Sequence, residues 1–232
     1  MSGTAVRSFV IRVADESRIE AILEFHKENL TKHLWPRTIK EFQSLAEQEN
    51  LYEAIETSGG GEELVGICYI MPGQEIKPPY AERDEFGGVY VADNCRSCGI
   101  GTALGKTSLA NHFAWDPPKG RLIAHVHEEN PLPRWMLVDR LGFLHKVEEN
   151  EIPPAEVVKV AAPSMKRNEE GQVVGHLFEF QHAALQKLAD WVEGFAGTIK
   201  GKSGESRLQI ALPSMTRYRS NTIKALREHR KR

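Results

Sequence analysis

Alternating apolar and polar side chains mark a short strand at residues 9–13. The next strands are expected at residues 51–56 and 64–70. Two segments of helical periodicity separate the first two strands: Asp15 or Ser17 can cap the first helix, and Pro36 opens the second, which ends near Asn50. Glycines 59–61 predict a hairpin turn between the last two strands. The predicted order is therefore strand, helix, helix, strand, strand.

In the rest of the chain, strand and helix patterns follow each other more closely. A strand at 86–91 leads through a polar turn at 93–101 into an amphipathic helix that ends near Phe113. The other expected strands are 121–127, 143–147, 173–180 and 208–212, and the other expected helices are 131–141 and 182–195. Gly142 is the expected C-cap of the shorter helix. This mixture of elements predicts an α/β (α+β) fold.

The composition fits one or two compact domains and excludes several classes of protein. The 232 residues are 41% apolar and 27% charged, without repeats or low-complexity runs, which argues against collagen-like, linker-like and solenoid proteins. No apolar run approaches the roughly 20 residues that a membrane-spanning helix needs, so no membrane span is expected. The formal net charge of −2 excludes a strongly basic nucleic-acid binder by composition.

Positive charge is concentrated near the C-terminal end. Residues 217–232 hold seven lysines and arginines against one glutamate, a net charge of +6 that leaves −8 for residues 1–216. Two interpretations stay open, because a basic tail can contact RNA or another acidic partner, or it can be a solvated terminal helix, which is the commoner case. RNA binding through residues 217–232 predicts an affinity that falls steeply with salt.

The three cysteines, Cys68, Cys95 and Cys98, bear on the compartment and on metal binding. Their odd number lacks the paired spacing of a disulfide framework, and the first residues lack an apolar leader-like stretch, so we expect a cytoplasmic protein. Cys95 and Cys98 form a single CxxC pair, without a second pair or suitably spaced histidines. Such a pair is poor support for zinc, and no metal site is expected.

The turn at 93–101 has the features of an anion-binding loop. A strand ends there, the turn presents successive backbone N–H groups, and Gly99 and Gly101 let a ligand approach the main chain. The helix that follows directs its positive dipole end at the same point, and Arg96 can add a fixed positive charge. Taken alone, the two glycines are explained equally well by close packing of a strand-to-helix turn. The loop is neither a Walker A loop nor a dinucleotide fingerprint, which makes ATP and NAD poor ligands.

Residues 96–101, Arg-Ser-Cys-Gly-Ile-Gly, resemble the Arg/Gln-x-x-Gly-x-Gly/Ala motif of the GCN5-related N-acetyltransferase (GNAT) superfamily. Two further segments agree: residues 122–130 are similar to the family's fifth strand with its trailing asparagine, and Leu-Gly-Phe at 141–143 is similar to the end of its next helix. The resemblance covers roughly residues 7–181. It implies a mixed, largely antiparallel sheet that is splayed between strands 4 and 5 and flanked by helices. Residues 1–181 would form the acetyltransferase domain, and residues 182–232 a C-terminal extension of a helix and the basic tail.

The resemblance also implies acetyl-CoA as the cosubstrate, bound in the cleft between the splayed strands. The pyrophosphate would lie on the backbone amides of the turn, and the pantetheine amides would pair with the backbone of Val91 and Asp93 like an added strand. The residues implied in CoA binding are Val91, Asp93, Arg96, Ser97, Cys98, Gly99, Ile100, Gly101, Thr102 and Asn130.

Direct attack of an amine on the thioester needs three things from the protein: orientation, a route to deprotonate the ammonium and a proton donor for the departing thiolate. The candidate catalytic groups are Glu85, near the start of the fourth strand, and His125 and His127, which share one face of the fifth. A histidine titrates near neutral pH and suits the task. Histidines on strands are also often packed or surface residues, and that alternative stays open for both.

One departure from the family's pattern concerns the proton donor. Family members often place a tyrosine about four residues before the Gly-Phe pair, and here that position is Val138. Two functions therefore stay open. The favoured one is an N-acetyltransferase, an acyltransferase that moves an acetyl group from acetyl-CoA to a primary amine of a small molecule or a protein. The alternative is a catalytically weak or inactive module that binds acyl-CoA or a partner. The sequence indicates neither the acceptor nor the oligomeric state.

Overall fold

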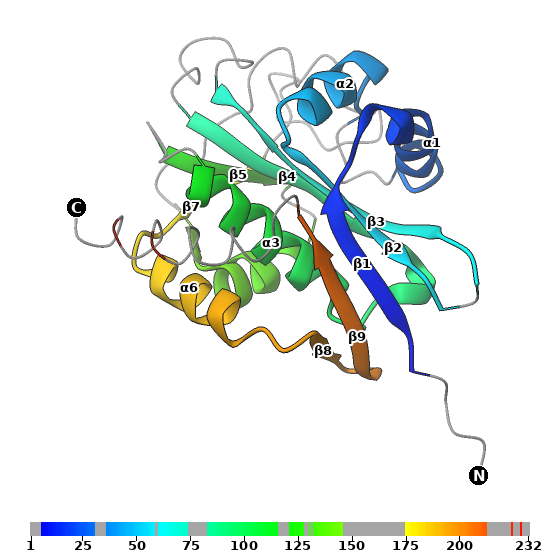
Figure 1. Ribbon diagram of the computed structural model, residues 1–232. Coiled ribbons are helices and arrows are strands. Elements are labelled where there is room, and N and C mark those ends of the chain that lie inside the picture. The colour runs from blue at the N-terminus through cyan, green and yellow to red at the C-terminus, as the bar shows by residue number, and fades with distance from the viewer. Residues whose placement is uncertain are drawn as a thin grey trace.

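The computed structural model describes residues 6–30, 36–58, 60–73, 83–115, 121–127, 130, 132–145, 175–212, 224 and 228. Within them, nine strands form one twisted sheet in the order β6-β7-β5-β4-β3-β2-β1-β9-β8 (Figure 1). The strands are β1 (Ser8–Val13), β2 (Leu51–Glu56), β3 (Glu63–Met71), β4 (Arg83–Val91), β5 (Arg121–His127), β6 (Phe143–His145), β7 (Gly175–Phe180), β8 (Thr198–Gly201) and β9 (Gly204–Ala211). The β1–β9 and β4–β5 pairs are parallel, and the other pairs are antiparallel. The mixed, largely antiparallel sheet is therefore confirmed.

Helices cover both faces of this sheet (Figure 1). The helices α1 (Ile19–Glu28) and α2 (Ile39–Glu47) pack a small apolar cluster onto β2 and β3. The opposite face carries the larger core, which is closed by α3 (Ile100–Trp115), η4 (Met136–Leu141) and α6 (Ala184–Gly194). The short helix α4 (Leu132–Trp135) leads into η4. The sheet thus lies between two separate apolar layers. A ligand can enter between these layers only where two neighbouring strands separate.

The start of α2 corrects one expectation. Thr38, rather than Pro36, begins the helix: the Thr38 hydroxyl accepts the Glu41 N–H (3.3 Å), and the Glu41 carboxylate accepts the Thr38 N–H (2.7 Å). This capping box satisfies two backbone donors at the helix end, which a proline side chain cannot do.

Most of the other predicted elements are confirmed with small changes of boundary. The strand β4 begins at Arg83, three residues earlier than expected, because Arg83–Glu85 pair with β5. The last predicted strand, 208–212, begins earlier as β9 (Gly204–Ala211). Residues 146–147 and 173–174, at the ends of two other predicted strands, lie outside the described residues.

The sheet opens between β4 and β5. These two strands pair only over Arg83–Glu85 and Arg121–Ile123. Beyond that point, within the part of the chain that the structure describes, β4 pairs only with β3 and β5 pairs only with β7. The register of β4 on β3 shifts by one residue around Gly88, whose φ of +60° is in the left-handed region. Because such a bulge bends and twists a strand, it explains why β4 turns away from β5 here. The splay predicted between the fourth and fifth strands is therefore present.

The segment after residue 181 contributes to the same sheet. The expected helix 182–195 is α6, and β9 pairs in parallel with β1 at the far end of the sheet from the split. The strand β8, which the sequence pattern did not reveal, forms a hairpin with β9. The division into a domain of residues 1–181 and an extension of residues 182–232 stays a prediction. No helix in the described part of the chain has both the length and the apolarity to span a bilayer.

Candidate functional site

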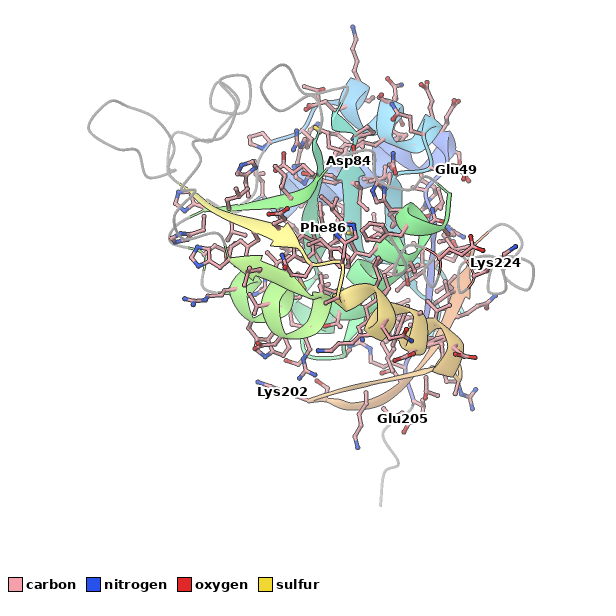
Figure 2. The ribbon with its side chains drawn as sticks, turned by 90° about the vertical axis from the view of Figure 1, so that its left-hand side faces the viewer. Glu49, Asp84, Phe86, Lys202, Glu205 and Lys224 are labelled. Carbon is pink, nitrogen blue, oxygen red and sulfur yellow. The ribbon has the colours of Figure 1, made fainter. Side chains whose placement is uncertain are left out.

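A cleft lies in the opening between β4 and β5. Its walls come from Glu85–Val89 of β4, Ala124–Val126 of β5, and Met136 and Leu137 of η4. Arg37 and Tyr69 close it on the side of α2 and β3. Phe86, labelled in Figure 2, is buried beside the point where the strands part and packs on Phe143, with 5.5 Å between the ring centroids. The cleft therefore has an apolar wall toward the larger core and a polar wall toward α2.

Glu85 and His125 meet on the polar wall. The carboxylate Oε1 lies 3.3 Å from the imidazole Nδ1, and both side chains are almost completely buried. Burial opposes ionisation of Glu85, but His125 and then Arg37 outweigh it, so the pKa of this carboxyl is lowered. Glu85 is therefore a carboxylate at neutral pH. Through this contact it holds the His125 ring in place.

Arg37 and Tyr69 form a second buried pair beside the first. The Arg37 Nε donates to the Tyr69 hydroxyl (3.0 Å), and its Nη1 pairs with Glu41 (3.0 Å). Burial raises the pKa of Tyr69, although Arg37 opposes the shift, so the phenol keeps its proton at neutral pH. The cleft therefore presents a fixed cation and a hydroxyl next to the Glu85–His125 pair.

The helical segment η4 places its residues differently from the position that the family would use for tyrosine. Val138 is 36% exposed and does not line the cleft, whereas Met136 and Leu137 do. Neither of these side chains can donate a proton. Gly142 ends the segment in the left-handed conformation (φ +86°), as expected for a C-cap.

The turn after β4 leaves several backbone N–H groups without acceptors. The N–H groups of Arg96 and Cys98 donate to the carbonyls of Asp93 and Cys95, each at 3.3 Å. The N–H groups of Ser97, Gly99, Ile100, Gly101 and Thr102 have no acceptor among the residues that the structure describes. Three of these belong to the first turn of α3, where N–H groups point out of the helix end. N–H groups without acceptors at the start of a helix suit an anion, and anion binding by this turn stays a prediction.

The side chains of the turn are arranged around its rim. The exposed Arg96 guanidinium pairs with Asp93 (2.7 Å) and lies over the Tyr90 ring. At Gly101, an added Cβ would lie 3.5 Å from Val91, 3.8 Å from Met136 and 3.9 Å from Val89. Because Val89 and Met136 also line the cleft, the turn and the cleft adjoin.

Cys95 and Cys98 lie on the inner side of the turn and are buried. Both sulfurs contact one guanidinium, because Arg7 donates to the Cys95 Sγ (2.8 Å) and to the Cys98 Sγ (3.6 Å). Arg7 also pairs with Glu56 and donates to the Asn94 carbonyl (2.7 Å). Burial raises the pKa of the Cys95 thiol to about 11, although Arg7 opposes the shift. No group of three or more potential metal ligands gathers within the described residues.

We expect Cys95 to be inert in the folded protein. Thiolates, not thiols, react with iodoacetamide, and a buried thiol with this pKa is almost entirely protonated at pH 8. Mass spectrometry should find Cys95 alkylated at least tenfold more slowly in the native protein than in urea, as estimated from its thiolate fraction. Equal rates in the two states would contradict the buried arrangement around Arg7.

The structure brings together only some of the residues that the sequence singled out. Glu85, His125 and Asn130 line the cleft, whereas His127 is buried but does not line it. The Asn130 N–H donates to the His127 carbonyl (2.9 Å), which turns the chain at the end of β5. Most of the basic tail, residues 217–232, lies outside the described residues. Lys224 and Glu228 are the two residues of the tail that the structure describes. The CoA-binding set stays a prediction, with its turn residues adjoining the cleft.

Sequence reasoning missed Arg37, Tyr69 and Arg7. Tyr69 sits in an apolar run and is typical of a core residue, and Arg37 follows a proline in an irregular segment. Arg7 precedes β1 and reaches the turn at 93–101 only through the fold. No local pattern marks any of the three, because their partners lie more than 30 residues away along the chain.

Solved structures show what this arrangement resembles. The chain is similar to one in the NatC complex bound to Gag peptide and CoA, with a TM-score of 0.50, 16% identity, 74% of this chain covered and 97% of that chain. The chain is also similar to Rv2747 of Mycobacterium tuberculosis in complex with CoA and NLQ, with a TM-score of 0.49, 16% identity, 74% of this chain covered and 98% of that chain. For a GNAT-family acetyltransferase from Streptococcus pneumoniae, the TM-score is 0.48 and the identity 14%, with 75% of this chain covered and 99% of that chain. No family model and no curated protein matches the sequence.

The described geometry defines a class of fold: a mixed sheet split between two parallel neighbours, with a strand-to-helix turn at the mouth of the split. The similarity to the NatC chain identifies this class as the fold of the GCN5-related N-acetyltransferases. At 16% identity, the likeness establishes the fold, and the site has to be argued from its own residues.

Proposed function

We propose that this protein is an N-acetyltransferase that moves an acetyl group from acetyl-CoA to a primary amine. One observation carries the proposal: Val89 and Met136 lie within 4 Å of the position that a Cβ on Gly101 of the turn would take, and both also line the cleft that holds Glu85 and His125. An anion-binding main chain and a carboxylate–imidazole pair therefore open into one space. A ligand with a diphosphate at one end and a reactive acyl group at the other matches such a space.

The donor half of the site fits coenzyme A. The unpaired N–H groups of Ser97, Gly99, Ile100 and Gly101 would hold the diphosphate, assisted by the dipole of α3. Among the described strands, none pairs with β4 beyond Glu85 on the β5 side, so the backbone of this edge can pair with the amides of the pantetheine arm. Acetyl-CoA supplies an acyl group activated as a thioester. The protein orients this group toward the polar wall.

The acceptor half of the site fits an amine. A primary amine resembles lysine, with a pKa near 10.4, and arrives protonated at neutral pH. His125 is the group that takes its proton, and the ionised Glu85 stabilises the imidazolium that results. The buried carboxylate also attracts a cationic substrate into the cleft. Together these groups supply the deprotonated amine that direct attack needs.

The Tyr69 hydroxyl is the best placed donor for the departing thiolate. Tyr69 lines the cleft and retains its proton, and its hydroxyl accepts a hydrogen bond from the Arg37 Nε. This phenol comes from β3 and not from the helix before Gly142, where Val138 faces solvent. Tyr69 would thus take the role for which family members often use a tyrosine on that helix.

The alternative function, an acyl-CoA-binding module without turnover, is favoured by one observation, the exposed Val138. Release of free thiol from acetyl-CoA separates the two functions. We expect thiol release above background with at least one member of a panel of polyamines, amino acids and peptides with free N-termini. Saturable CoA binding without thiol release across the panel would favour the module.

A further inference from the structure

The hairpin of β8 and β9 lies directly against the turn at 93–101. A Cβ added to Gly201 would lie 2.0 Å from the Ser97 carbonyl oxygen and 2.6 Å from the Cys98 carbonyl carbon. The backbone N–H of Ser203 donates to the Ser97 carbonyl (3.3 Å). An added Cβ at Gly99 would approach the Lys200 carbonyl to 3.3 Å. The hairpin and the turn therefore meet backbone to backbone, with no side chain between them at Gly201. Lys202 and Glu205, labelled in Figure 2, flank the tip of this hairpin.

The contact fixes one peptide plane in the turn at both ends. Ser203 holds the Ser97 carbonyl oxygen, and the Cys95 carbonyl accepts the N–H of the same peptide, that of Cys98. Ser97 (φ +67°) and Gly99 (φ +91°), on either side of Cys98, are both in the left-handed region. A serine persists in that region only where its surroundings hold it there. The direction of the neighbouring N–H groups depends on this plane.

Arg7 holds the same turn from the other side. Its guanidinium reaches the Asn94 carbonyl and both cysteine sulfurs of the turn. The carbonyl of Arg7 accepts the N–H of Arg207 on β9 (2.9 Å), so β1 and the hairpin are joined at this point. The sheet edge formed by β1, β9 and β8 therefore supports the turn as one unit.

We propose that the β8–β9 hairpin, together with Arg7, is a brace that holds the turn at 97–101 in the conformation that binds the diphosphate of coenzyme A. Gly201, Ser203 and Arg7 are positioning residues, because they act on the ligand only through the turn. The inference rests on the proposed function. It adds that the segment after residue 181 is part of the donor site.

The test compares Gly201→Ala with Gly194→Ala, which lies in the same segment with no atom within 4 Å of its added Cβ. Calorimetry with CoA and with pantetheine, which lacks the diphosphate, gives the readout. We expect Gly201→Ala to weaken CoA binding roughly tenfold or more, the effect of displacing one or two hydrogen bonds to a charged group, and to leave pantetheine binding unchanged. Hydrogen exchange of the Cys98 N–H, the one in the turn at 97–101 with an acceptor among the described residues, should also become faster. Gly194→Ala should match the original protein in both measurements.

Three outcomes separate the claims. A folded Gly201→Ala variant with unchanged CoA affinity would overturn the brace and leave the proposed function intact. An equal loss for CoA and pantetheine would also overturn it, because the effect would then be general. A failure of the unaltered protein to bind CoA would remove the proposed function and the brace with it. If Gly201→Ala does not fold, Arg7→Lys takes its place, with the same selective loss of CoA affinity expected.

Discussion

Replacing His125 with alanine should lower kcat for acetyl transfer by about 10²–10⁴-fold, the usual contribution of a general base. The Glu85 carboxylate would remain, but its lowered pKa makes it a weak base for an alkylammonium ion. CoA affinity should be unchanged, because the turn that would hold the diphosphate does not include β5. The measurement is steady-state kinetics with the best acceptor from the amine panel, together with calorimetry for CoA.

The exposed His182, at the start of the segment before α6, gives a matched control. His182→Ala should leave kcat unchanged. An unchanged CoA affinity separates this loss of activity from general destabilisation of the fold. A variant with full activity would show that another group accepts the proton.

Replacing Gly88 with alanine should lower the free energy of unfolding by about 3 kcal/mol, the sum expected for overpacking and for a left-handed backbone with a side chain. The added Cβ would lie 1.8 Å from the Tyr69 Cε1 atom, and φ at this position is +60°. Either the Tyr69 ring or the bulge in β4 has to move. Because both form the cleft, acetyl transfer should decline as well. Urea denaturation followed by circular dichroism measures the first effect.

The neighbouring Gly87 provides the comparison. A Cβ there would lie 3.4 Å from the Tyr69 Cε2 atom, which is an ordinary contact, and its φ is not in the left-handed region. Gly87→Ala should therefore cost much less stability than Gly88→Ala. If the two variants unfolded at the same urea concentration, the bulge would not depend on glycine at position 88. The bulge would then not explain why β4 turns away from β5.

The sequence could predict much of the fold because most of its elements carry local signals. The apolar stretches at 51–56 and 64–70 form β2 and β3, which are buried along most of their length, and the cap signal of Asp15 is present as a hydrogen bond from the Ser17 N–H. The turn at 96–101 was predicted from two signals together. Glycine spacing next to a helix start left anion binding and close packing equally open, and the resemblance of residues 96–101 to the family motif favoured anion binding.

The missed features depend on contacts between distant segments. The strand β8 is four residues long and alternates only weakly, so it becomes a strand by pairing with β9. The Gly-Gly pair in β4 was a usable signal for a bulge, because glycine inside a strand often marks one. Arg37 and Tyr69 carried no such signal. Tyr69 comes near Glu85 because β3 pairs with β4. Arg37, just before α2, reaches Tyr69 through the packing of distant segments and not through any periodicity of the sequence.

The central claim is that the backbone N–H groups at the start of α3 bind the diphosphate of coenzyme A at the mouth of the split between β4 and β5. Calorimetric titration of the full chain with CoA tests it most directly. The account predicts saturable one-to-one binding, with an affinity well above that for pantetheine. Well-folded protein that produced no binding heat with CoA, or that bound pantetheine equally well, would contradict it.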